Sequence, residues 1–314
     1  MIGRKRRAAS RGCVMARSMQ EQITYCADCL LVAQRISLYC EQVGLDFQWL
    51  PGCKSSFIIR KYAQFIGLDP ALTEQTLLEA SEAKEDDDLG MFDKNKPLLV
   101  NGGHRHLRYR GNKVPRRKMW FQDADMNDRV CIYAYTGFQY AVTEAQRNIS
   151  VSPLVEKTLR KLNEDFGLEL NHGIFTVYED GNDSIGVHTD KLRTIGNKPN
   201  DLIVGLKTGE EGRDFVLTAL KAEGEKAFPS PFFKEKLEPG TLFCISPYDN
   251  MYSCAHGVPQ TVCGRTSSLV FRRITKWMSR EGYEHKRIAC EKTKECAKKR
   301  KLNQQERGKK LVPY

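Results

Sequence analysis

The 314-residue sequence contains no apolar run that approaches the length of a membrane-spanning helix, which needs about 20 consecutive apolar residues. Its first residues, Met-Ile-Gly-Arg-Lys-Arg-Arg-Ala, lack the apolar segment of a secretory signal peptide. No internal repeat is present either. We therefore expect an intracellular protein without a membrane partner, whose 40% hydrophobic content can supply a globular core.

A disulfide framework is also not expected, although the chain has eleven cysteines. Without a secretory signal, these residues indicate reduced thiols in an intracellular setting. Cys26-Ala-Asp-Cys29 is a lone CxxC motif, and no second close pair follows at zinc-ribbon spacing. We interpret these cysteines as thiols on packed helices.

Acidic residues are missing from two basic segments and are outnumbered in a third. The net charge is +11, but residues 1–17 hold six Arg and Lys without an acid, and residues 276–314 carry a net +8. Residues 100–120 hold seven Arg and Lys, again without an acid, interleaved with aromatic side chains. Cations for phosphates beside flat rings for bases are typical of nucleic-acid binding.

This pattern predicts a nucleic-acid partner, and a solvated basic loop is the alternative. The predicted substrate-binding residues in this segment are Arg110, Arg116, Arg117, Trp120 and Phe121. The basic runs at residues 4–7 and 298–301 fit nuclear targeting or nonspecific phosphate contact. We expect a nuclear protein, with the cytoplasm as the alternative.

Histidine is rare as well, with six in the chain, yet one lies in the triplet His188-Thr189-Asp190. In an extended strand, residues i and i+2 share a face, so His188 and Asp190 can reach one metal ion. His256 is the predicted third ligand. Two imidazoles and one carboxylate form the facial set that holds Fe(II) and leaves positions open. A lone HxD triplet in a surface turn is the alternative.

The surrounding sequence predicts short strands. Residues 173–178 form an apolar run, a turn follows, and residues 184–187 lead directly to His188. Two further turn-plus-strand patterns lie at residues 239–245 and 267–271. Short strands at this spacing suit a barrel or a jelly roll, whose open mouth can house a metal ion.

Six segments between about residues 98 and 275 resemble, in order, the Fe(II)/2-oxoglutarate dioxygenases, and most of all their AlkB-like nucleic-acid demethylase branch. The best match is Tyr178–Asp190, because that family shows Tyr, Gly and Ile ahead of its HxD triplet. The other five segments are Val114–Lys118, Phe121–Asp123, Tyr133–Gly137, Gly212–Phe215 and Leu269–Arg272.

The resemblance implies Fe(II) as cofactor, with 2-oxoglutarate and O2 as cosubstrates. The distal carboxylate of 2-oxoglutarate needs a cation, and a guanidinium matches it with two hydrogen bonds. Arg265, which begins an Arg-x-Ser motif, is the predicted partner, and Arg272 is the alternative because the two lie seven rather than six residues apart. A hydroxyl of Ser267 or Tyr178 is expected to complete the site.

Three further positions bear on the site. Thr176 stands where the family usually has an Asn that helps to hold 2-oxoglutarate. Leu192 replaces a carboxylate that helps to set base preference, so we expect it to line the substrate pocket and to favour unpaired strands. Arg213 is expected to support a turn rather than to take part in catalysis.

The predicted architecture is α+β with a double-stranded β-helix (jelly-roll) core. We expect a basic, disordered segment at residues 1–17 and a helical extension with an acidic linker at residues 18–90. The dioxygenase domain should cover residues 91–275 and be followed by a basic tail at 276–314. Helical spacing is seen at residues 57–66, and helices are expected to start at Pro70, capped by Asp69, and to cover residues 153–162.

The sequence therefore predicts Fe(II)- and 2-oxoglutarate-dependent oxidation of a modified nucleic-acid base by N-demethylation, in a monomer. One alternative is a hydroxylase of a protein side chain or of a thymine methyl group. Another is a non-catalytic nucleic-acid-binding adaptor with a decayed iron site, against which the intact ligand triplet argues.

Overall fold

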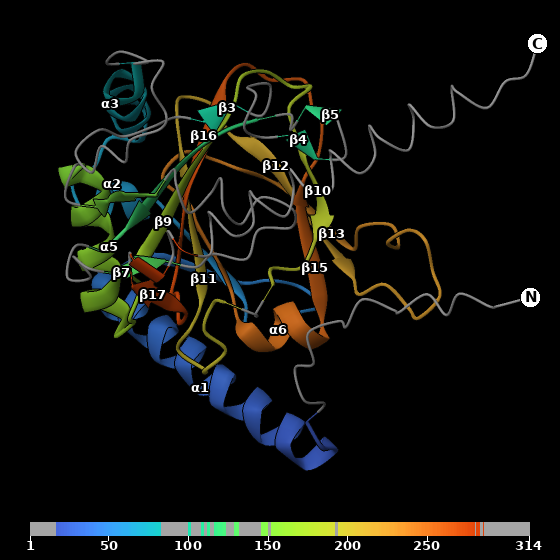
Figure 1. Ribbon diagram of the computed structural model, residues 1–314. Helices are drawn as coiled ribbons and strands as arrows, with labels where there is room; N and C mark the ends of the chain where they lie inside the picture. The colour runs from blue at the N-terminus through green and yellow to red at the C-terminus, as the bar shows by residue number, and fades with distance from the viewer. Residues whose placement is uncertain are drawn as a thin grey trace, which may run out of the picture.

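In the computed structural model two β-sheets face each other, and helices cover the outer face of the larger one (Figure 1). The structure describes residues 17–82, 100–101, 108–109, 112–113, 116–123, 129–131, 146–149, 152–191, 194–279, 281–282 and 285. The expected disordered segment at 1–17, the acidic linker and most of the basic tail lie outside this range. No described helix has the length and apolar character needed to span a membrane.

Eight strands form the core of the fold. They are β9 (His172–Tyr178), β10 (Ile185–His188), β11 (Ile203–Thr208), β12 (Arg213–Ala219), β13 (Phe233–Leu237), β14 (Leu242–Ile245), β15 (Cys254–Val258) and β16 (Thr266–Arg272). One sheet contains the antiparallel order β14-β11-β16-β9, and the other is β10-β15-β12-β13. The chain thus crosses repeatedly between two four-stranded layers, as in a jelly roll. The predicted fold class is confirmed.

The larger sheet continues beyond these strands at both edges. On one side lie β2 (Phe57–Arg60) and β1 (Asp46–Trp49), and on the other lie β6 (Arg117–Gln122) and β3 (Val100–Asn101), with β8 (Gln146–Asn148) parallel to β6. Two small sheets pair β17 (Trp277–Ser279) with β7 (Arg129–Cys131), and β4 (Arg108–Tyr109) with β5 (Asn112–Lys113).

Strand alternation divides the apolar side chains between two layers. Phe175 and Val177 of β9 lie on the outer face of the larger sheet, under the helices α1 (Met19–Val43) and α5 (Pro153–Phe166). Ile174 of β9 points the other way, into the space between the sheets, where it packs with Phe215 and Leu217 of β12. The cavity described below opens from this inner layer.

The N-terminal extension is partly a strand rather than wholly helical. After α1 the chain forms β1 and β2, then the short α2 (Tyr62–Phe65) and α3 (Pro70–Glu82). The helical interpretation of residues 57–60 is wrong, because this apolar run forms a strand that pairs with β14 on one side and β1 on the other and is buried there. The predicted cap of α3 is confirmed, since Asp69 accepts from the backbone N–H of Ala71 and Leu72.

Helix α5 is also confirmed, with Ser152 as its N-cap and Pro153 in its first turn. In Figure 1 it covers the outer face of the larger sheet, while α1 runs beneath the two sheets and α3 lies at the opposite end of that face. The extension therefore buries apolar surface of the two-sheet region and is packed against it.

Candidate metal centre and cosubstrate cavity

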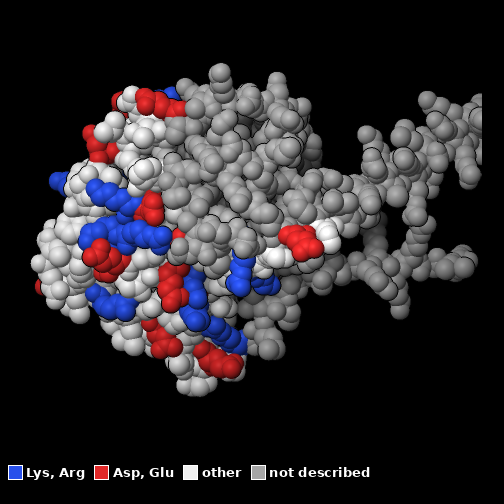
Figure 2. Space-filling view, turned by 60° about the vertical axis from the view of Figure 1, so that its left-hand side comes forward, with Lys and Arg blue, Asp and Glu red and all other residues white. Residues whose placement is uncertain are grey.

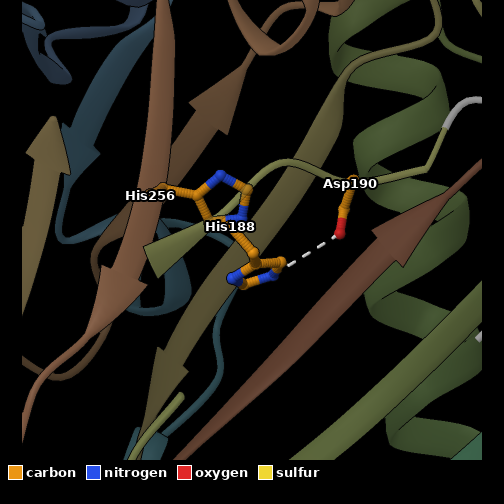
Figure 3. A group of neighbouring side chains, drawn as sticks. All are labelled: His188, Asp190 and His256. Carbon is orange, nitrogen blue, oxygen red and sulfur yellow. Dashed lines mark ion pairs between the residues drawn. The ribbon is translucent and has the colours of Figure 1, made fainter. Parts of the chain in front are cut away.

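His188, Asp190 and His256 are brought together by the pairing of β10 with β15. His188 is the last residue of β10 and lies opposite His256 of β15 in the antiparallel register. Asp190 follows two residues later, beyond the strand end. Figure 3 shows the three side chains converging from these two segments.

The geometry of the three groups suits one metal ion. One ligand atom of each residue lies within 4.8 Å of the others. His188 Nε2 is 3.7 Å from Asp190 Oδ1, and the two imidazole centroids are 4.6 Å apart. His188 Nδ1 lies 2.9 Å from the carbonyl oxygen of Gly186. A carbonyl can only accept, so Nδ1 carries the proton and the Nε2 lone pair is free for a metal.

Burial keeps both imidazoles neutral. It lowers the pKa of His256 to about 3, with a further lowering by the neighbouring His188. Burial likewise lowers the pKa of His188, against the opposing effect of Asp190. Neutral imidazole is the form that binds a metal. His256 Nδ1 is buried and has no hydrogen-bond partner among the described residues, so the protein alone does not satisfy this ring.

Asp190 is held as a carboxylate by its surroundings. Burial acts to raise its pKa, but the charge of Arg272 and the hydrogen bond from its side chain outweigh burial and hold the pKa well below the usual value. Arg272 donates to Asp190 Oδ2 from Nε at 2.7 Å and from Nη2 at 2.6 Å. The other oxygen, Oδ1, faces His188. The donor set and its protonation therefore fit a divalent cation such as Fe(II).

Helix α6 (Pro247–Tyr252) fixes the backbone of Asp190. The side-chain oxygen of Asn250 accepts from the Asp190 N–H at 2.8 Å, and its Nδ2 donates to the Asp190 carbonyl at 3.0 Å. These two hydrogen bonds hold the backbone of Asp190 and thereby fix the point from which its side chain extends. Asn250 was not predicted as a site residue, because only the tertiary structure brings α6 to this loop.

A cavity between the two sheets leads to the metal-ligand group. Every second residue of β9 and of β16 lines the cavity. β9 contributes Ile174, Thr176 and Tyr178, and β16 contributes Ser268, Val270 and Arg272. Thr176 and Tyr178 thus lie where the cosubstrate was predicted. Ser267 points to the opposite face, where it bonds Thr208 and Glu74, and Ser268 takes its place in the cavity.

Arg265 is not part of this lining. Its side chain is 52% exposed and its Nε donates to Glu74 at 3.0 Å. It precedes β16 rather than lying on it. The structure therefore does not bring Arg265 to the cavity, and the prediction that it binds the distal carboxylate is corrected. The alternative, Arg272, lies in the cavity, but both of its donor atoms named above are directed at Asp190.

Three other cations line the cavity: Lys118 of β6, Lys207 of β11 and Arg213 of β12. Arg213 donates to the carbonyl oxygens of Asp180, Asp183 and Pro259, and its guanidinium lies over the Tyr178 ring at 4.6 Å. These contacts tie down the loop before β10, as expected for a turn-supporting arginine.

Lys207 is buried, with 5% of its surface exposed. Its Nζ donates to the carbonyl oxygen of Ser267 at 2.8 Å, and no carboxylate of the described chain lies within salt-bridge distance of it. Burial lowers its pKa to about 7. The sequence alone could have indicated Lys207 as a site residue, because this lysine interrupts the otherwise apolar strand Ile-Val-Gly-Leu-Lys-Thr.

The basic segment differs from its predicted role. Trp120 and Phe121 of β6 are completely buried in the two apolar layers, so neither ring can stack on a base. Arg116 donates to the Ser184 carbonyl at 2.7 Å, and Arg117 pairs with Glu179. The prediction failed because alternation along a central strand buries both aromatic rings. Arg110 and Leu192 lie outside the described residues.

On the face drawn in Figure 2, the described Lys and Arg residues are interspersed with Asp and Glu. This part of the surface therefore has no continuous positive or negative patch. One example is Arg160, which pairs with Asp123 at 3.0 Å and with Glu156 at 3.6 Å. This face carries α5. Such mixed charge gives no basic track for a phosphate backbone there.

Comparison with solved structures gives remote likenesses, including the following two. A prolyl-4-hydroxylase from Pseudomonas putida aligns with a TM-score of 0.35 and 13% identity over 78% of this chain and 100% of its own. An oxidoreductase of the 2OG-Fe(II) oxygenase family from Burkholderia pseudomallei aligns with a TM-score of 0.33 and 13% identity over 80% of this chain and 91% of its own. No family model and no curated protein matches the sequence. At this distance neither likeness carries an argument about activity, which rests on the site itself.

Proposed function

We propose that the protein is an Fe(II)- and 2-oxoglutarate-dependent dioxygenase. One observation carries the proposal: two neutral imidazoles and one carboxylate converge at the end of a cavity whose lining includes apolar side chains and several cations. These three residues would hold the metal ion from one side and would leave its other positions to the cosubstrates. When bound, the iron couples oxidative decarboxylation of 2-oxoglutarate to hydroxylation of a C–H bond.

Within this proposal, Lys207 receives the distal carboxylate of 2-oxoglutarate. It is a buried ammonium group that faces the cavity and donates to one carbonyl oxygen, whereas an ammonium has three donors. Arg213 and Arg272 are engaged with loop carbonyls and with Asp190. Thr176 and Tyr178 flank the same wall and can position the bound dicarboxylate. A carboxylate in this position compensates a cation that the fold buries without one.

The test combines metal binding with turnover. Succinate release is measured with Fe(II), 2-oxoglutarate and a screen of substrates, and metal binding is measured separately by titration with Mn(II). His188→Ala should remove both, because two ligands remain, while the thermal unfolding transition stays cooperative. Thr189→Ala, the residue between the two ligands, is the control and should keep Mn(II) binding. Full activity in a folded His188→Ala protein would exclude this site.

For the substrate we propose a modified nucleic-acid base, oxidised by N-demethylation. The support is the uninterrupted basic character of residues 100–120 and of both terminal runs, together with the AlkB-like motifs. A base must leave a duplex to reach the metal, so single strands should be preferred. The hydroxylated N-methyl group would then be lost as formaldehyde.

A mass-spectrometric screen of methylated oligonucleotides tests this finer proposal. Binding should weaken steeply with salt, by a log–log slope of about 0.7–0.9 for each phosphate contact. Arg110→Gln should lower that slope, whereas Arg160→Gln, on the mixed-charge face, should leave it unchanged. Absence of binding to any oligonucleotide at low ionic strength would favour a protein side chain as substrate while leaving the dioxygenase proposal intact.

A further inference from the structure

Helix α3 of the N-terminal extension brings a carboxylate to the end of β11 and β16. Glu74 is buried, with 5% exposed, although it lies on a short surface helix. Its Oε2 accepts from the Ser267 hydroxyl at 2.5 Å, and its Oε1 accepts from Arg265 Nε at 3.0 Å. A carboxylate is seldom buried unless it is paired, so this contact ties α3 to the first residues of β16.

Ser267 connects Glu74 to Lys207 through hydrogen bonds of its side chain and its backbone. Ser267 gives its only hydroxyl proton to Glu74, so the contact of 2.6 Å between Ser267 Oγ and Thr208 Oγ1 must be donated by Thr208. The Ser267 carbonyl in turn accepts from Lys207 Nζ at 2.8 Å. Glu74 therefore fixes the residue whose backbone orients the lysine.

The backbone is shaped to admit this carboxylate. Gly209, directly after β11, has a φ of +98°, and a Cβ there would lie 2.2 Å from Glu74 Oε2. Its N–H donates to the Pro70 carbonyl at 2.9 Å, at the start of α3. Only glycine permits both this conformation and this approach.

We infer that Glu74 is a positioning residue of the dicarboxylate site, so that the N-terminal extension supplies part of that site. This inference rests on the proposed function. Through Ser267, Glu74 orients Lys207, and its negative charge favours the protonated lysine that a carboxylate requires. Titratable groups around Lys207 come from four segments. They are Glu74, Arg213 and Glu238, with the Cys263 thiol as a further titratable group; Glu74 and Glu238 support protonation of the lysine and Arg213 opposes it.

The experiment measures 2-oxoglutarate affinity of the full-length protein loaded with Mn(II), by calorimetry, between pH 6 and pH 9. Burial lowers the pKa of Lys207 to about 7 and the Glu74 charge raises it, so loss of that charge lowers it further. Glu74→Gln should therefore lose affinity at a lower pH than the wild type. Affinity should fall on the order of tenfold at pH 8 and little at pH 6, since one unit of pKa changes the protonated fraction tenfold.

Glu79→Gln is the matched control, because Glu79 lies exposed on the same helix and contacts Gln75. It should leave the pH profile unchanged. Ser267→Ala keeps the Glu74 charge but removes the hydrogen bond, so it should weaken binding equally at every pH. This second variant also tests the inference if Glu74→Gln fails to fold.

The outcomes are distinct. Absence of 2-oxoglutarate binding to the wild type would overturn the proposed function itself. Normal binding by the wild type, with a Glu74→Gln profile identical to that of Glu79→Gln, would overturn the role of Glu74 alone. An equal loss at every pH for Glu74→Gln, as expected for Ser267→Ala, would overturn the effect of the Glu74 charge on Lys207 and leave only the positioning through Ser267.

Discussion

Lys207 places a buried ammonium group beside a cavity, and this arrangement should cost the folded protein stability. Its pKa falls from 10.5 to about 7 because of burial. Between these two values the unfolded chain binds the proton and the folded chain does not, so stability should rise with pH across this window. Below pH 7 both states are protonated and the penalty is complete.

Lys207→Met should therefore stabilise the protein most at low pH. We expect a gain of roughly 2–4 kcal/mol in the free energy of unfolding at pH 6, and almost none near pH 10. Urea unfolding at the two pH values measures the difference. The same variant should lose 2-oxoglutarate affinity. A gain that is equal at both pH values would show that the lysine is not desolvated in the folded state.

Phe121 gives a second prediction at the scale of one residue. Its ring is completely buried in the layer between the larger sheet and the helices, so Phe121→Ala should leave a cavity. We expect destabilisation of about 3–5 kcal/mol and unchanged oligonucleotide affinity in the protein that remains folded. Denaturant unfolding measures the loss of stability, and a binding titration at low temperature measures the oligonucleotide affinity. A stable variant with weakened binding would restore the stacking role predicted from sequence.

At the scale of elements, α6 controls the metal site through Asn250. Its side chain holds both backbone groups of Asp190, so Asn250→Ala should let the loop after β10 move. Loss of such supporting contacts reduces metal affinity by about 10–100-fold. Mn(II) titration measures the loss, and Tyr252→Phe on the same helix is the control. Unchanged affinity would mean that β10 and β15 alone position the carboxylate.

The pairing of β2 with β14 also acts at this scale. It extends the larger sheet and turns the loop between β1 and β2 toward α6, where Asp249 accepts from the backbone of Lys54 and Ser55 at 2.8 Å. The extension and the metal-supporting helix are thus joined by buried hydrogen bonds. These hydrogen bonds hold the extension against the jelly roll.

At the scale of the whole molecule, the extension and the catalytic region should fold together. Ala33, Ile36, Phe57 and Ile59 belong to the same buried layer as β9 and β16. A chain that begins at residue 91 would expose this layer and lose more than the 5–15 kcal/mol by which domains are usually stable. We expect it to be insoluble or unfolded by circular dichroism, whereas the full chain unfolds in one transition. A soluble, metal-binding fragment would contradict this.

The sequence by itself determined the parts of the protein that depend on local pattern. The HxD spacing and the turn-flanked strands predicted a barrel or a jelly roll with a metal site, because strand alternation and ligand chemistry follow from neighbouring residues. The resemblance to the dioxygenases then selected the jelly roll and supported the metal ligands. The caps at Asp69 and Ser152 are local in the same sense.

Only the tertiary structure decided which face each side chain occupies and which distant groups it meets. Whether Ser267 or Ser268 enters the cavity depends on strand register, since one residue reverses the face. Trp120 and Phe121 are buried because other layers cover both sides of β6. Glu74 reaches Ser267 across almost 200 residues of chain, at a separation of 193. Such contacts arise when elements pack, and they have no local signature.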